Sequence, residues 1–206
     1  MYLLLVFLSL AAARLQGSVS EMEAKSVIVN PGMVLWSSAL KLDLGWYALD
    51  DGVMGGKSKT NLPAGSLFDG NWNGVVSTEN NGGFAGIRTK LLSPLRDASS
   101  CTGFLLSVTG DGQRYKFVAR DTADWEGIAW STTFDTTAGQ VTEVKVPFSG
   151  MIPTRRASTV KPTYPFNKER LSDVQMTLSK FEYDGGLNPS FTAGPFQLTL
   201  NQISYY

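Results

Sequence analysis

A chain of 206 residues with 43% hydrophobic and 17% charged residues is long enough to form one large globular domain with a sizeable core. Its 18 basic and 18 acidic residues balance, so no global charge attracts nucleic acid or an anionic membrane. The chain has no histidine and one cysteine, Cys101. It therefore cannot be a hydrolase with a Ser-His-Asp or Cys-His arrangement, and it cannot hold an internal disulfide, a cysteine-based zinc site or an iron–sulfur cluster.

The chain begins with a short apolar run, Tyr2–Ala13, which is too short to cross a bilayer as a helix. Its length is typical of the hydrophobic region of a signal peptide, and the alanines at 11–13 provide small residues for cleavage, although no basic flank precedes the run. We interpret residues 1–20 as a targeting segment or N-terminal tail, and we expect residues 21–206 to form a single domain.

From Ser26 onward, apolar and polar residues alternate with a period of two, which is typical of β-strands. The clearest strands are expected at Phe104–Thr109 and Arg114–Arg120, with a turn between them at 110–112. Asn80–Gly83 has the composition of a hairpin turn. Many short strands without an amphipathic helix predict an all-β, antiparallel sandwich or barrel, with further strands at 26–30, 74–78, 84–90, 128–134, 144–148, 174–178 and 196–200.

The most distinctive stretch, Trp46–Ser58, places two adjacent carboxylates before three glycines that flank a methionine. We expect at least one of these glycines to have a positive φ in a tight turn, and a carboxylate to accept hydrogen bonds from nearby backbone amides. Turn chemistry alone explains these residue types; the alternative interpretation is a recognition loop. In that case its candidate binding residues are Asp50, Asp51, Gly52, Met54, Gly55 and Gly56.

The two adjacent carboxylates are also candidates for a calcium site or an acid–base site. Two neighbours provide too few oxygens for calcium, and no second acid is placed for catalysis. We therefore assign no catalytic residue, no metal and no cofactor.

A second unusual region, Ser149–Arg170, contains three prolines and no strand pattern, so we expect a long loop there. From Lys145 to Arg170 there are six basic residues against one acidic residue, which leaves a local charge of +5. The loop is either a solvated segment or a contact surface. Arg155 and Arg156 are the first candidates for contact, because guanidinium groups pair bidentately with carboxylates.

Tryptophan side chains could also supply a platform for stacking sugars, although most such residues lie in a core. Trp130 is in phase with a predicted strand and is expected in the core. Trp72 and Trp125 lie in turn-rich contexts and are the better candidates for exposure.

Several motifs lie in order along roughly 46–206, namely Asp50–Gly56, Asn80–Phe84, Arg88, Gly110–Gly112, Arg114, Tyr115, Phe134–Thr136, Val146–Phe148, Arg155, Arg156 and Gly194–Phe196. Taken together in this order, they resemble the complex I intermediate-associated protein family (NADH:ubiquinone oxidoreductase intermediate-associated protein thirty). The resemblance implies a galactose-binding-like jelly-roll sandwich. The chain departs from the family pattern at Val141-Thr142 and Ala157, both near the basic loop, so contacts there are expected to differ.

Members of that family are best known as assembly factors for mitochondrial complex I, and related domains support photosystem assembly in plastids. The resemblance implies a non-enzymatic assembly or accessory protein that docks on subunits of respiratory complex I or a photosystem, peripheral to the membrane. Because the leader is secretory-like, an organellar location in a plastid is slightly favoured over a mitochondrion, with the secretory pathway as the alternative. The alternative function is a carbohydrate-binding module of a secreted or organellar protein, which the fold equally permits.

Overall fold

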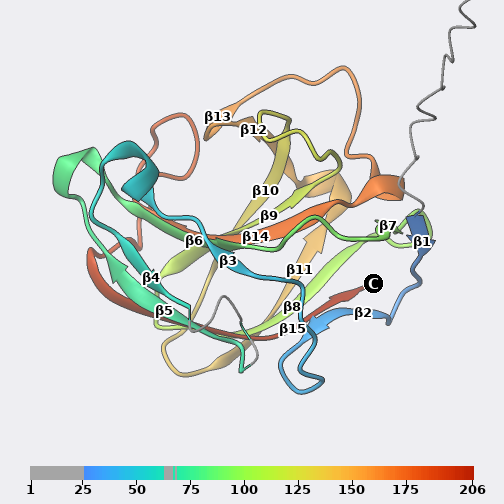
Figure 1. Ribbon diagram of the computed structural model, residues 1–206, viewed down its shortest axis with the longest axis horizontal. Coiled ribbons are helices and arrows are strands. Elements are labelled where there is room, and N and C mark those ends of the chain that lie inside the picture. Colours follow the sequence, from blue (N-terminus) through green and yellow to red (C-terminus); the bar gives the residue numbers. More distant parts are fainter. Residues whose placement is uncertain (1–25, 63–66, 68) are drawn as a thin grey trace, which may run out of the picture.

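The computed structural model describes residues 26–62, 67 and 69–206, which form two antiparallel sheets packed as layers (Figure 1). The leader proposed for residues 1–20 lies outside the described residues. The predicted all-β, antiparallel sandwich is confirmed. Within the described part of the chain, no helix has the length and apolar character needed to cross a membrane.

One layer is a seven-stranded sheet with the order β13-β12-β10-β9-β14-β6-β3. Every pairing in it is antiparallel. Its strands are β3 (Tyr47–Ala48), β6 (Phe84–Arg88), β9 (Arg114–Arg120), β10 (Ala129–Asp135), β12 (Ile152–Arg155), β13 (Ser158–Thr159) and β14 (Asp173–Ser179).

The other layer is a six-stranded antiparallel sheet with the order β11-β8-β15-β5-β4, in which β2 also pairs with β15. Its strands are β2 (Val34–Ser37), β4 (Lys59–Asn61), β5 (Asn71–Val76), β8 (Gly103–Thr109), β11 (Val141–Pro147) and β15 (Gly194–Tyr205). A small parallel pair joins β1 (Ser26–Ile28) to β7 (Leu95–Asp97). Helical structure among the described residues is limited to 3-10 turns, including η1 (Asp51–Met54), η3 (Glu79–Asn81), η4 (Phe148–Gly150) and η5 (Lys168–Arg170).

The core lies between the layers and is filled mainly by alternate residues of the longer strands. On β9 the buried residues Tyr115, Phe117 and Ala119 join the core, as the alternating pattern predicts. Phe117 meets Phe104 of the opposite layer edge-on, with ring centroids 5.1 Å apart. The intervening residues of β9 therefore point to the outer face of the seven-stranded sheet.

Two predicted hairpins are wrong. Asn80–Gly83 connects β5 to β6, and Gly110–Gly112 connects β8 to β9, but in each case the two strands belong to different layers. A turn composition shows where the chain reverses and does not show whether the next strand pairs with the last one or crosses the sandwich.

Two smaller predictions are corrected as well. Ser149–Arg170 is not a structureless loop, because it contains β12, β13 and η5. Trp72, which was expected to be exposed, is fully buried, and its ring packs against Tyr115 and Phe196. The other two expectations are confirmed: Trp125 is exposed and Trp130 is buried.

Candidate functional site

Asp51 anchors the glycine turn to the rest of the sandwich. Its Oδ1 accepts a hydrogen bond from Ser58 N (2.9 Å), and its Oδ2 accepts from Ser58 Oγ (2.7 Å), Gly83 N (2.7 Å) and Phe84 N (3.2 Å). Burial raises the pKa of Asp51, but these hydrogen bonds outweigh it and hold the pKa below its usual range. The carboxylate thus joins η1 to the start of β6.

Asp50 makes a second anchor beside the first. Its carboxylate accepts hydrogen bonds from Thr60 N (2.7 Å), Thr60 Oγ1 (2.6 Å) and Gly86 N (3.2 Å), which ties the turn to β4 and β6. The expected bonds to backbone amides are confirmed: Ser58 N lies at the end of the same stretch, and the other amide donors lie in β4, in β6 or directly before β6. With their oxygens occupied by hydrogen-bond donors, the two carboxylates are arranged as structural anchors.

The turn that Asp50 and Asp51 anchor exposes two apolar side chains to solvent. The expected positive φ is found at Gly55 (87°), which closes η1, while Gly52 and Gly56 have ordinary φ angles. At the end of the turn, Val53 is 77% exposed and Met54 is 73% exposed. We call Val53 and Met54 the apolar tip; Figure 1 shows η1 at one end of the sandwich, next to the η3 connection.

Arg88 lies on the outer face of the seven-stranded sheet in a buried ion pair. Its Nε and Nη2 donate to the two oxygens of Asp173 at 2.8 and 2.9 Å. Arg120 joins the same carboxylate through Nη1 (3.1 Å) and also donates to Gln175 Oε1 (3.1 Å). The exposed ring of Trp125 covers Arg88, with 4.8 Å from guanidinium carbon to ring centroid.

Arg114 and Tyr115 are neighbours in sequence that point to opposite faces of β9. Arg114 forms a bidentate pair with Asp135 (2.7 Å for each bond) and a third bond to Glu182 (2.7 Å), and these partners raise its pKa. Tyr115 lies in the core, where its hydroxyl donates to Asp111 Oδ1 (3.0 Å) and burial raises its pKa. Tyr115 therefore has no surface to offer a partner directly, because the alternation of the strand turns it inward.

Arg155 and Arg156 lie at the turn between β12 and β13, and both are exposed. Arg156 has a positive φ of 50° and pairs with Glu126, with 2.7 Å between Nη2 and Oε2. We call Arg155 and Arg156 the arginine turn. Because Glu126 follows Trp125, the loop after β9 connects the arginine turn to the Arg88 cluster.

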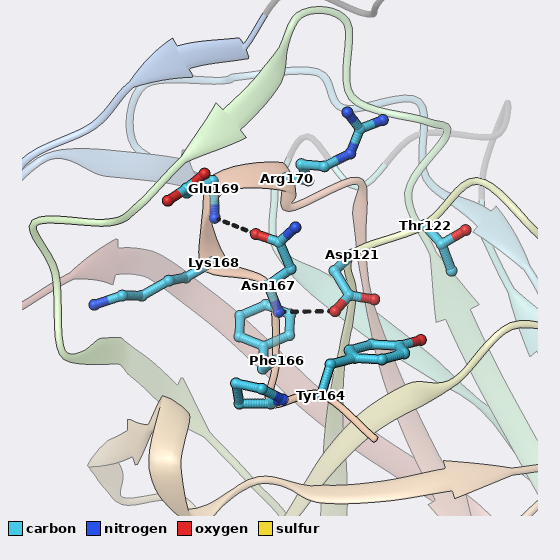
Figure 2. A pocket seen from close by; sticks show the side chains of 9 residues that line it. Asp121, Thr122, Tyr164, Phe166, Asn167, Lys168, Glu169 and Arg170 are labelled. Carbon is cyan, nitrogen blue, oxygen red and sulfur yellow. Dashed lines mark hydrogen bonds between the residues drawn. The ribbon is translucent and has the colours of Figure 1, made fainter. Parts of the chain in front are cut away.

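A pocket of about 490 Å³ opens between the end of β9 and η5 (Figure 2). Asp121 lies in its wall, 7% exposed, and accepts a hydrogen bond from Asn167 N (2.8 Å). Burial raises the pKa of Asp121. Tyr164 and Phe166 line the pocket and rest against Trp130, with ring centroids 6.5 and 5.8 Å from its own.

The candidate residues therefore fall into separate places. The glycine turn forms one; Arg88 and the arginine turn lie on either side of the Trp125 loop; and Arg114 belongs to the other end of β9. Sequence reasoning missed the roles of Arg120, Asp173 and Asp121. The alternation along the strand already placed the Arg120 side chain on the outer face of the sheet. Its hydrogen-bond partners, however, are more than 50 positions away in the sequence, so no local pattern predicts them.

The model of one protein family, complex I intermediate-associated protein 30 (CIA30), matches residues 36–200 of the chain. Among curated proteins no match was found.

Solved structures with the same fold include two carbohydrate-binding modules from Clostridium thermocellum. The family 11 module of the cellulosomal cellulase Lic26A-Cel5E is 15% identical, with a TM-score of 0.56 over 87% of this chain and 95% of that one. A family 11 module in complex with a β-1,3-1,4-mixed-linked tetrasaccharide is 14% identical, with a TM-score of 0.55 over 85% and 96%. An agarase, AgWH50C, is 8% identical, with a TM-score of 0.51 over 84% of this chain and 24% of that one. At these identities the likeness is one of fold: a galactose-binding-like β-sandwich.

Proposed function

This chain belongs to the complex I intermediate-associated protein 30 family, and from that membership we propose that it is a non-catalytic assembly or accessory protein that docks on a membrane electron-transport complex. The proposed client is respiratory complex I or a photosystem, in a mitochondrion or a plastid. The observation that carries the proposal is the family match, which runs from β2 into β15 and so spans the sandwich.

Two surface features support docking. The arginine turn offers two exposed guanidinium groups from a short hairpin, and only Arg156 is paired among the described residues. The apolar tip offers Val53 and Met54 on a turn that seven hydrogen bonds to two carboxylates hold in place. A rigid, exposed apolar pair loses little entropy when it is buried against a partner.

The test is co-purification of the tagged protein with solubilised membrane complexes, with the partner identified by mass spectrometry. We expect the wild type to recover subunits of one electron-transport complex, and the double variant Arg155→Glu/Arg156→Glu to lose them. Lys59→Glu/Lys145→Glu, on the edge strands β4 and β11, makes the same charge change in the other layer and should retain them. Recovery of no membrane complex by the folded wild type would contradict the proposal.

A second candidate function is binding of a carbohydrate. It is favoured by the exposed ring of Trp125 over the outer face, since tryptophan rings stack on sugars, and by the fold shared with a module that holds a tetrasaccharide. Retention of the wild type by a glycan array, lost in Trp125→Ala and with no complex recovered from membranes, would favour this function over docking.

A further inference from the structure

The outer face of the seven-stranded sheet carries two guanidinium groups and one carboxylate in the same buried cluster. Arg88 and Arg120 both donate to Asp173, and the side chains are 7%, 11% and 2% exposed, respectively. The neighbouring side chain that also accepts a hydrogen bond from Arg120, Gln175, is an uncharged amide. The cluster therefore has one positive charge more than it can neutralise internally.

Burying a charge without an opposite charge nearby costs free energy, because the charge loses its hydration and the protein supplies too few ion pairs and hydrogen bonds in return. Burial lowers the pKa of Arg120, and Arg88 lowers it further, while Asp173 raises it. Arg120 Nε is buried and has no hydrogen-bond partner among the described residues. The cluster thus has both a charge and a donor to offer to an anion.

Trp125 covers the cluster on its solvent side. Its ring is 57% exposed and lies over Arg88, and the next residue, Glu126, is fastened to Arg156. The loop is therefore held at its far end by an exposed ion pair, which is weak. A small movement of the loop would open the arginine pair to solvent while the indole ring still forms an apolar wall.

We propose that Arg88, Arg120, Asp173 and Trp125 form a binding site for a carboxylate ligand. A single carboxylate supplies the one negative charge that the cluster lacks, and its two oxygens match the planar fork of a guanidinium. The carbon chain of the ligand then packs on the Trp125 ring. The site shares no residue with the arginine turn or the apolar tip, so acetate binding tests it separately from the proposed docking. The carboxylate belongs either to a small free acid or to an acidic side chain of a protein.

Trp125 provides the readout, because the other four tryptophans are buried. The wild-type protein is titrated with sodium acetate at constant ionic strength, while tryptophan emission and the melting temperature are recorded. We expect a saturable change in emission with a dissociation constant of about 1–10 mM, and a rise in melting temperature, because the ligand binds only the folded state. Trp125→Phe keeps a ring over Arg88 and should lose the emission change but keep the rise in melting temperature.

Arg120→Gln removes the surplus charge and should weaken acetate binding by about tenfold or more, the loss expected for a charge-assisted hydrogen bond. Its melting temperature should equal or exceed that of the wild type, whereas a purely structural arginine would lower it. Lys145→Gln, on β11, is the matched control for loss of a positive charge and should bind acetate normally.

A blocked tripeptide with one glutamate distinguishes the source of the carboxylate, with its glutamine counterpart as control. Binding at least about tenfold tighter than acetate assigns the site to an acidic protein side chain, and equal or weaker binding assigns it to a small free acid. The proposal is overturned if wild type shows neither signal with acetate, if Arg120→Gln binds as well as wild type, or if a neutral mixed-linked tetrasaccharide changes the emission while acetate does not.

Discussion

Gly55 and Gly56 are adjacent, yet each is a glycine for a different physical reason. Gly55 has φ 87°, a conformation that a side chain disfavours, and space around it is open. Gly56 has an ordinary φ, but a Cβ there would overlap the carboxylate of Asp51. Gly52 has neither constraint. The sequence alone shows three equivalent glycines, and only the placement of Asp51 separates their roles.

This difference predicts three outcomes for alanine substitutions, measured as the free energy of unfolding in urea. Gly55→Ala should cost about 1–2 kcal/mol, the strain of a left-handed backbone with a side chain. Gly56→Ala should cost more, about 2–4 kcal/mol, because it displaces the carboxylate from its hydrogen bonds. Gly52→Ala is the matched control and should change stability by less than about 0.5 kcal/mol. Equal effects at all three positions would refute this account of the turn.

At the scale of elements, the connection from β14 to β15 covers part of the outer face of β9. Lys116 of β9 donates from Nζ to the backbone oxygen of Glu182, and its ammonium lies 4.5 Å from the ring centroid of Tyr183. Burial lowers the pKa of Lys116 from 10.5 to about 8, although Glu182 opposes the change. The segment that covers β9 therefore buries the Lys116 ammonium group, and its charged form destabilises the folded state.

The consequence is a dependence of stability on pH. Between pH 8 and pH 10 the unfolded chain holds a proton that folded Lys116 has released, so the free energy of unfolding should rise with pH. We expect this residue to contribute a rise of about 2 kcal/mol. Above that range Tyr183, whose pKa burial raises to about 12, acts in the opposite direction.

Lys116→Met should be more stable than wild type near pH 7 and should lose the rise, as measured by urea unfolding at each pH. Lys145→Met, an exposed lysine on β11, is the control and should leave the rise intact. An unchanged slope in Lys116→Met would show that its charge is well solvated.

The same strands show how far sequence reasoning reaches. The period of two predicted β9, β10 and β14 within a residue or two, because it follows from burial on one side of a strand. It could not predict that β8 and β9 lie in different layers, since either arrangement buries Phe104 and Phe117 equally well. The candidate site was found only in part for the same reason: Arg88 was identified, but Asp173 is 85 residues away and no local pattern pairs them.

At the scale of the whole molecule, fold and function rest on different observations. The sandwich fold is shared with carbohydrate-binding modules that are only 14–15% identical in sequence. This identity is too low to infer that the chain binds the same ligand. The family match covers most of the chain and is the stronger guide to function. The balance of 18 basic and 18 acidic residues means that long-range attraction to a partner is small, so any electrostatic docking must come from a local surface.

That neutrality makes the salt dependence of docking a test of which surface is used. If the arginine turn makes the contact, recovery of the membrane complex should fall as sodium chloride rises, since exposed ion pairs are screened over roughly 8–10 Å at 0.1–0.15 M salt. The Arg155→Glu/Arg156→Glu variant should then show weak recovery with little further dependence on salt. Val53→Ser/Met54→Ser removes the apolar tip without changing charge, and its recovery should decline with salt along the same slope as the wild type.

A contact made by the apolar tip would give the reverse pattern: recovery that holds as salt rises in the wild type and disappears in the serine variant. Quantitative mass spectrometry of the co-purified subunits at several salt concentrations separates the two, and we expect the slope to belong to the arginine turn because hydrophobic contacts do not weaken with salt.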